Sequence, residues 1–178
     1  MTVTETTDGN KTKNRIPIWT WIWVYLISFP FRLLALFIGR RKNYFEVTDS
    51  EWTDLYPFPT DGHKIERKII AETGFDGFIK FFHLQTADKK INDLLRDKIF
   101  GDFYWEKDYG IFLRQFDTPD EWPISYLVFI DTKDFSFQRL KKVNSSFAEW
   151  KYEGINDTDF NILIEWTKTY TTRLTIKK

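Results

Sequence analysis

The distribution of apolar side chains divides the chain into a polar start, one long apolar stretch and a mixed remainder. Residues 1–15 are rich in Thr, Asn and Lys without periodicity, which predicts a disordered tail. Residues 16–38 are apolar apart from three polar side chains. As a helix this stretch would span about 35 Å, enough to cross a hydrocarbon core of about 30 Å. We therefore expect a single transmembrane anchor over residues 16–39.

Both ends of the apolar stretch carry side chains that favour a membrane interface. Indole rings prefer the headgroup level, and a cluster of cations follows the opposite end. A cleaved signal peptide, a buried hairpin and a helix lying in the membrane plane are the alternatives. The first lacks a small-x-small cleavage pattern, and the third needs a broader polar face. The predicted interface residues are Trp19, Trp21, Trp23, Arg40, Arg41 and Lys42.

The three polar side chains of the stretch share one face of the predicted helix. Thr20, Ser28 and Arg32 fall on one i, i+4 row. Arg32 either snorkels to the interface or faces, with the rest of the row, a second helix or a water-filled lumen. Because one helix cannot line a pore, the second interpretation requires a homo-oligomer.

The remaining residues, 43–178, mix helix-like and strand-like patterns. Apolar repeats of four with a following Gly predict helices within residues 60–73 and 86–100. Residues 135–143 and 145–153 are ambiguous, and a capping-box pattern in the second range fits a short helix. Strand patterns cover 102–107 and 110–116 as a hairpin, 125–131 as a strand buried on both faces, and 160–166 with 170–176 as a closing hairpin.

The predicted fold class is thus α+β. We expect an N-terminal transmembrane helix followed by one compact domain with two or three helices and a mostly antiparallel sheet. The domain would occupy residues 43–178, a length that suits a single core.

Composition and charge exclude several kinds of chemistry. The chain has no Cys, which excludes a disulfide framework, a thiolate zinc site and a Cys nucleophile. Residues 1–42 carry a net charge of +5 and the remainder −5. A net-acidic domain is a poor partner for nucleic acid, whereas basic residues around an apolar stretch suit a bilayer. The positive charges flank the stretch almost evenly, and we place the main domain on the cytoplasmic side because a short tail is easily translocated.

Motifs for phosphate, dinucleotide or acyl chemistry are absent from the sequence. His63 and Glu66 are spaced as a metal pair on one helix, but a local structural contact is the simpler interpretation. His83 stands between apolar residues and is expected to be packed or hydrogen-bonded. We therefore expect no enzyme activity, no cofactor and no metal site.

One short pattern imitates a metal-dependent nuclease. Asp120 follows a Pro, and Asp131 with Lys133 follows an apolar strand. Two carboxylates that share a metal must lie within a few ångströms of each other. An extended strand between them would separate them by up to about 36 Å, so turn and strand-end roles are the simpler prediction.

Residues around Trp122 form the predicted partner-contact patch. Asp117, Asp120 and Glu121 surround this Trp in an expected loop. Acidic groups beside an exposed aromatic ring are suited to contact with a protein partner. A solvated turn is the alternative.

These observations lead to three functional hypotheses. In the first, a membrane-anchored, non-enzymatic accessory or effector protein self-associates and acts at the bilayer, for example by forming a pore. In its general architecture the chain resembles small one-segment membrane proteins of bacterial defence systems, although no motif assigns a family. The second is a membrane-tethered immunity or adaptor protein whose acidic aromatic domain binds a protein partner. The third is a divergent metal-dependent nuclease.

Overall fold

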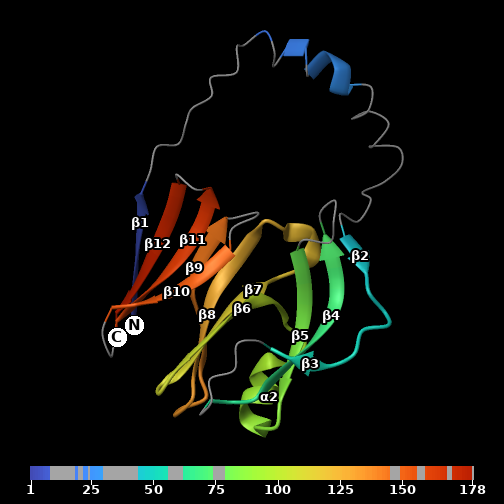
Figure 1. The fold of residues 1–178 in the computed structure, drawn as a ribbon. Coiled ribbons are helices and arrows are strands. Elements are labelled where there is room, and N and C mark those ends of the chain that lie inside the picture. Colours follow the sequence, from blue (N-terminus) through green and yellow to red (C-terminus); the bar gives the residue numbers. More distant parts are fainter. Residues whose placement is uncertain are drawn as a thin grey trace.

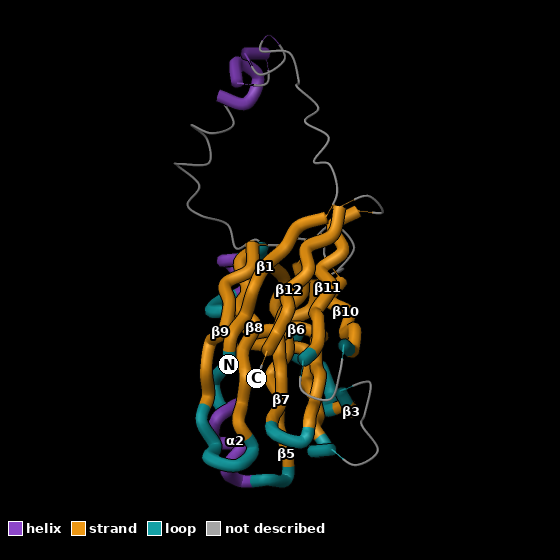
Figure 2. The backbone as a smooth tube through the Cα atoms, turned by 90° about the vertical axis from the view of Figure 1, so that its left-hand side faces the viewer, coloured by secondary structure: helices purple, strands orange, loops and turns teal. Residues whose placement is uncertain are grey.

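The computed structural model is an antiparallel β-structure made of two packed sheets (Figure 1). Residues 1–8, 19, 22–23, 25–29, 44–55, 62–73, 79–144, 149–155, 159–167 and 170–177 are described. The first and last described strands pair with each other, so the two ends of the chain lie side by side (Figure 2).

The larger sheet has the strand order β2-β4-β5-β6-β7-β8-β9, and β3 pairs with β4 beside this path. Every pair in it is antiparallel, and from β4 onward each strand pairs with the next strand along the chain. Its strands are β2 (Tyr44–Glu46), β3 (Thr53–Asp54), β4 (Ile65–Thr73), β5 (Ile79–Thr86), β6 (Ile99–Lys107), β7 (Gly110–Phe116), β8 (Ile124–Asp131) and β9 (Phe137–Asn144).

The smaller sheet has the strand order β1-β12-β11-β10. It packs on one face of the larger sheet through a shared apolar core, to which Phe112 and Phe129 contribute from one side and Phe160 and Ile176 from the other. These rings and branched chains are at most 4% exposed, so this interface is a true core. The strands are β1 (Thr2–Asp8), β10 (Glu149–Gly154), β11 (Phe160–Thr167) and β12 (Tyr170–Lys177).

The opposite face of the larger sheet is covered by α2 (Lys89–Leu95). Ile91 and Leu95 of this helix are buried in a second apolar cluster that also contains Phe100 and Ile111. Asp88 caps the helix, since its carboxylate accepts hydrogen bonds from the N–H groups of Lys90 and Ile91.

Strand β8 is a continuous apolar run because both of its faces are buried. Leu127 and Phe129 point into the core between the two sheets. Val128 and Ile130 point into the cluster beneath α2. Alternate residues therefore fill two cores, and the prediction of a strand buried on both faces is confirmed.

Both predicted hairpins are also confirmed. Strands β6 and β7 pair around the turn at Asp108 and Tyr109, with Lys107 opposite Gly110. Strands β11 and β12 pair with Phe160 opposite Ile176. In β11 and β12 alternate apolar residues enter the core between the sheets, which fits this register, whereas β7 is buried over its whole length.

The predicted fold class is wrong in its helices. Residues 65–73 form strand β4, and within 86–100 only Lys89–Leu95 is helical. Ile65 and Ile69 are four residues apart, a spacing that fits two strand periods as well as one helical turn. The ambiguous range 145–153 contains strand β10, and residues 145–148 lie outside the described part.

The predicted single-pass anchor, and with it the cell-membrane location, is contradicted. Among the described residues, no helix is long and apolar enough to cross a membrane. The rest of residues 16–39 falls mainly outside the described residues.

The prediction of a disordered tail over residues 1–15 is wrong for its first residues, which form a strand. Residues Thr2–Asp8 form β1, which pairs with β12 over its full length. Val3 packs against the core between the sheets. Thr is favoured in strands because its branched side chain packs well on a pleated surface, which accounts for a strand in a polar, Thr-rich segment.

Candidate functional site

The predicted partner-contact patch is a turn, and two of its side chains contact the larger sheet. The carboxylate of Asp117 is 2.5 Å from the guanidinium of Arg139 on β9. Asp120 and Glu121 are exposed on a short 3-10 helix, η1 (Pro119–Glu121). Trp122 is half-buried and packs against Phe81 and Phe116 rather than standing free in solvent. A contact role for this turn stays a prediction.

The nuclease pattern is not brought together in space. Asp120 precedes β8 and Asp131 ends it, and the two ends of this strand, Ile124 and Asp131, are about 23 Å apart. The carboxylate of Asp131 instead accepts hydrogen bonds from the backbone N–H groups of Lys133, at 2.8 Å, and Asp134, at 3.3 Å. Within the described residues no group of three acidic or His side chains is arranged to hold a metal ion.

The proposed metal pair is likewise separated. Glu66 lies on β4, where its carboxylate accepts a hydrogen bond of 2.7 Å from the amide of Gln85. His63 lies before that strand and contacts Glu106, which is 43 residues away in the chain. Without a helix here, the i, i+3 spacing no longer places the two side chains on one face.

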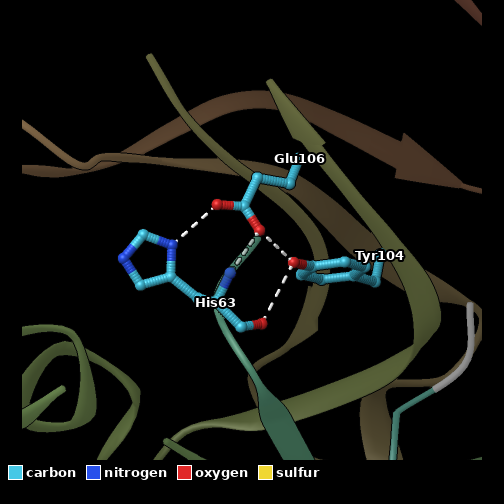
Figure 3. A network of polar contacts seen from close by, with 3 residues as sticks. All are labelled: His63, Tyr104 and Glu106. Atoms are coloured by element: carbon cyan, nitrogen blue, oxygen red, sulfur yellow. Dashed lines mark hydrogen bonds and ion pairs between the residues drawn. The ribbon is translucent and has the colours of Figure 1, made fainter. Parts of the chain in front are cut away.

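His63, Tyr104 and Glu106 form a compact polar cluster (Figure 3). One carboxylate oxygen of Glu106 accepts a hydrogen bond of 2.9 Å from the backbone N–H of His63 and a second bond from the Tyr104 hydroxyl. The other oxygen lies 2.6 Å from Nδ1 of the imidazole. Glu106 is only 10% exposed in its side chain, so these three donors replace the water that a buried carboxylate needs.

Strand β6 explains how the cluster is built. Tyr104 and Glu106 are two residues apart and therefore point to the same face of the sheet. Their side chains meet His63 in the segment just before β4, although β5 lies between β4 and β6 in the sheet. Burial and the neighbouring Glu106 carboxylate raise the pKa of Tyr104, so this phenol stays protonated as a hydrogen-bond donor.

In chemical terms, the cluster holds the imidazole ring of His63 in one orientation. A carboxylate at Nδ1 fixes the ring and leaves Nε2 as the acceptor in the neutral form. No hydroxyl or carboxylate among the described residues forms a hydrogen bond with Nε2. The cluster thus ties the segment before β4 to the sheet, and nothing described supplies a nucleophile next to it. The alternation of Tyr104 and Glu106 indicates a shared face, but no sequence pattern indicates His63 as their partner.

Sequence reasoning also missed a buried arginine. Arg114 on β7 is 3% exposed, donates a hydrogen bond of 3.1 Å to the hydroxyl of Ser125, and lies 5.0 Å from the ring centres of Phe116 and Trp150. Burial lowers the pKa of its guanidinium to about 10, while the charge of Asp102 acts in the opposite direction. Because Trp150 belongs to β10, this cation helps to join the two sheets.

The most unusual surface of the described residues is an apolar segment on residues 19–29. Seven large apolar side chains in it are between 44% and 72% exposed, and we call this group the apolar segment: Trp19, Ile22, Trp23, Tyr25, Leu26, Ile27 and Phe29. Contiguous exposed apolar groups of this kind mark interaction sites in folded proteins.

The predicted polar row and interface residues fall on and around this segment. Ser28 donates a hydrogen bond of 3.2 Å to the carbonyl of Tyr25, so its hydroxyl is satisfied within its own turn. Trp19 and Trp23 are described and exposed. Thr20, Trp21, Arg32, Arg40, Arg41 and Lys42 lie outside the described residues.

Comparison with known proteins gives no similarity from which a function could be inferred. No family model matches the chain, and neither a curated protein nor a solved structure is significantly similar to it. The functional conclusion therefore depends on the geometry of the described residues alone.

Proposed function

We propose that this protein acts by self-association, without enzymatic chemistry of its own, and that the apolar segment is the association surface. The observation that carries the proposal is the exposure of seven large apolar side chains within eleven residues of chain. Each such side chain contributes about 1.5–3 kcal/mol of favourable free energy when it is removed from water. Covering this segment would therefore release a large amount of free energy.

A second copy of the chain is the partner that we favour. Every copy carries the same segment, so a two-fold arrangement covers both segments with one contact. Trp and Tyr are the side chains most often found at the centre of such interfaces. Trp19, Trp23 and Tyr25 are 72%, 64% and 60% exposed in the single chain.

The test is the molar mass of the full chain by light scattering over a range of concentrations. We expect a dimer or a higher oligomer for the natural sequence and a monomer for the double variant Trp19→Ser with Trp23→Ser. Phe45→Ser is the matched control, because Phe45 is 76% exposed but lies on β2, away from the segment. This control should keep the mass of the natural chain.

Two results would overturn the proposal. One is a monomer at every concentration up to about 100 μM, since an interface of several buried aromatic side chains should hold together well below this value. The other is sedimentation of a monomeric protein with neutral phospholipid vesicles, lost in the double variant. That result would assign the segment to a lipid surface instead of a second copy.

A further inference from the structure

A depression of about 230 Å³ lies beside β5 and α2, far along the chain from the apolar segment. Its floor includes the buried side chains of Leu84 and Leu95. Its walls include Trp52, His83 and Asn92, from three different parts of the chain. An apolar floor with a few convergent polar groups is the usual form of a small-molecule site. The volume is below the usual range of about 300–1,000 Å³, so the depression suits a small ligand.

His83, which lines the depression, carries a hydrogen-bond acceptor whose position is fixed by the fold. Its Nδ1 is 3.1 Å from the carbonyl oxygen of Lys98, which can only accept a hydrogen bond. In the neutral imidazole the proton is therefore on Nδ1, and Nε2 carries the lone pair. None of the described residues forms a hydrogen bond with Nε2.

Asn92 and Trp52 supply a donor and a flat surface. The side-chain oxygen of Asn92 accepts a hydrogen bond of 3.1 Å from the backbone N–H of Thr86. Its amide NH₂ is then the group left for a ligand. Trp52 is 40% exposed, so part of its indole face is open to a stacking ring.

The charges at the rim favour an uncharged ligand. The guanidinium of Arg96 is already 2.5 Å from the carboxylate of Asp93. Asp97, which also lines the depression, adds a carboxylate to its wall. A phosphate or carboxylate on the ligand would meet one paired cation and a nearby anion, so an anionic group gains little here.

We propose that this depression binds a single uncharged heteroaromatic ring that carries an N–H next to a carbonyl, which is the chemistry of a pyrimidine nucleobase or nucleoside. The ring stacks on Trp52, its N–H donates to Nε2 of His83, and its carbonyl accepts from the amide of Asn92. This inference does not depend on self-association.

The experiment is an NMR titration of the full chain with uridine and, separately, with uridine monophosphate. An open site of this size should give a dissociation constant of about 0.1–1 mM for uridine. Trp52→Ala should weaken binding about tenfold, because base–aromatic stacking is removed. His83→Phe keeps a ring but removes the acceptor, and it should weaken binding about fivefold or more.

Phe45→Ala is the matched control, since it removes an exposed aromatic side chain outside the depression. It should bind uridine as the natural chain does, and the melting temperature of each variant shows whether it is folded. Three results would overturn the proposal: no saturable binding of uridine below about 10 mM, unchanged binding by folded Trp52→Ala, or tighter binding of the monophosphate than of uridine.

Discussion

Tyr104 is a residue whose protonation depends strongly on the fold. Its hydroxyl donates to Glu106, and both burial and that carboxylate raise the pKa of the phenol. In the unfolded chain the same phenol titrates near pH 10. The folded state therefore holds the proton at a pH where the unfolded state has lost it, so stability present below pH 10 is lost as the pH rises further.

The variant Tyr104→Phe tests this linkage. At pH 8 it should lower the free energy of unfolding by about 1–3 kcal/mol, because Glu106 loses one of its three donors while buried. At pH 11 the difference between the two proteins should be smaller, since only the natural chain still has this phenol to titrate. Urea unfolding at both pH values provides the measurement. A difference that stays constant or grows at pH 11 would contradict a raised pKa.

The sequence predicted the strand that carries Tyr104 and Glu106, but not the cluster that they form with His63. Alternation along β6 indicates that Tyr104 and Glu106 share a face. His63 lies before β4, which is not a neighbour of β6 in the sheet, so no strand pattern indicates this contact. Arg114 was missed for a related reason. In a strand sequence, a single cation is normally read as a solvent-facing residue. Arg114 is buried only because the second sheet packs over it, with the ring of Trp150 coming from a later strand.

At the scale of single elements, the β6–β7 hairpin depends on a glycine. A Cβ atom at Gly110 would overlap both the ring of Phe129 and the backbone oxygen of Ile130. Neither group can move without disturbing strand β8, which fills both cores of the larger sheet. Gly110→Ala should therefore lower the free energy of unfolding by about 2–3 kcal/mol, measured by chemical denaturation.

Gly154→Ala is the comparison for that variant. A Cβ atom at Gly154 would meet only the far end of the Tyr152 side chain, at 3.0 Å, and Gly154 is an exposed residue at the end of edge strand β10. We expect a change within about 0.5 kcal/mol. Equal effects of the two variants would mean that close backbone approach does not restrict the hairpin.

The elements themselves differed in how well the sequence predicted them. The β11–β12 hairpin was predicted from alternating apolar residues, and the β6–β7 hairpin from strand patterns on both sides of a turn. Strand β8 was predicted from an apolar run whose short length fits a strand better than a helix. Strand β4 was assigned to a helix because Ile65 and Ile69 fit both periods. Within 86–100 the helix is limited to Lys89–Leu95, because β6 begins at Ile99 and takes the following residues into the sheet.

At the scale of the whole molecule, the two ends of the chain complete one sheet. Strand β1 has β12 as its neighbour, and Glu5 forms an ion pair of 2.8 Å with Lys141 of β9 in the other sheet. Hydrophobic periodicity could not predict this strand, since Val3 is the only apolar side chain in it. Its place in the fold comes from pairing with the last strand, a contact between residues that are most distant in sequence.

Val3 therefore offers a test of whether β1 contributes to the stability of the whole fold. Its side chain is half-buried against the core between the two sheets, whereas that of Thr4 is exposed. Val3→Ser should lower the free energy of unfolding by about 1–2 kcal/mol, because it removes apolar area from that core, while Thr4→Ser should change it by no more than about 0.5 kcal/mol. The midpoint of guanidinium unfolding measures both. If the two variants unfold at the same midpoint as the natural chain, β1 is an addition to the sheet that the remaining strands do not need, and the core formed by β6 to β12 is stable without it.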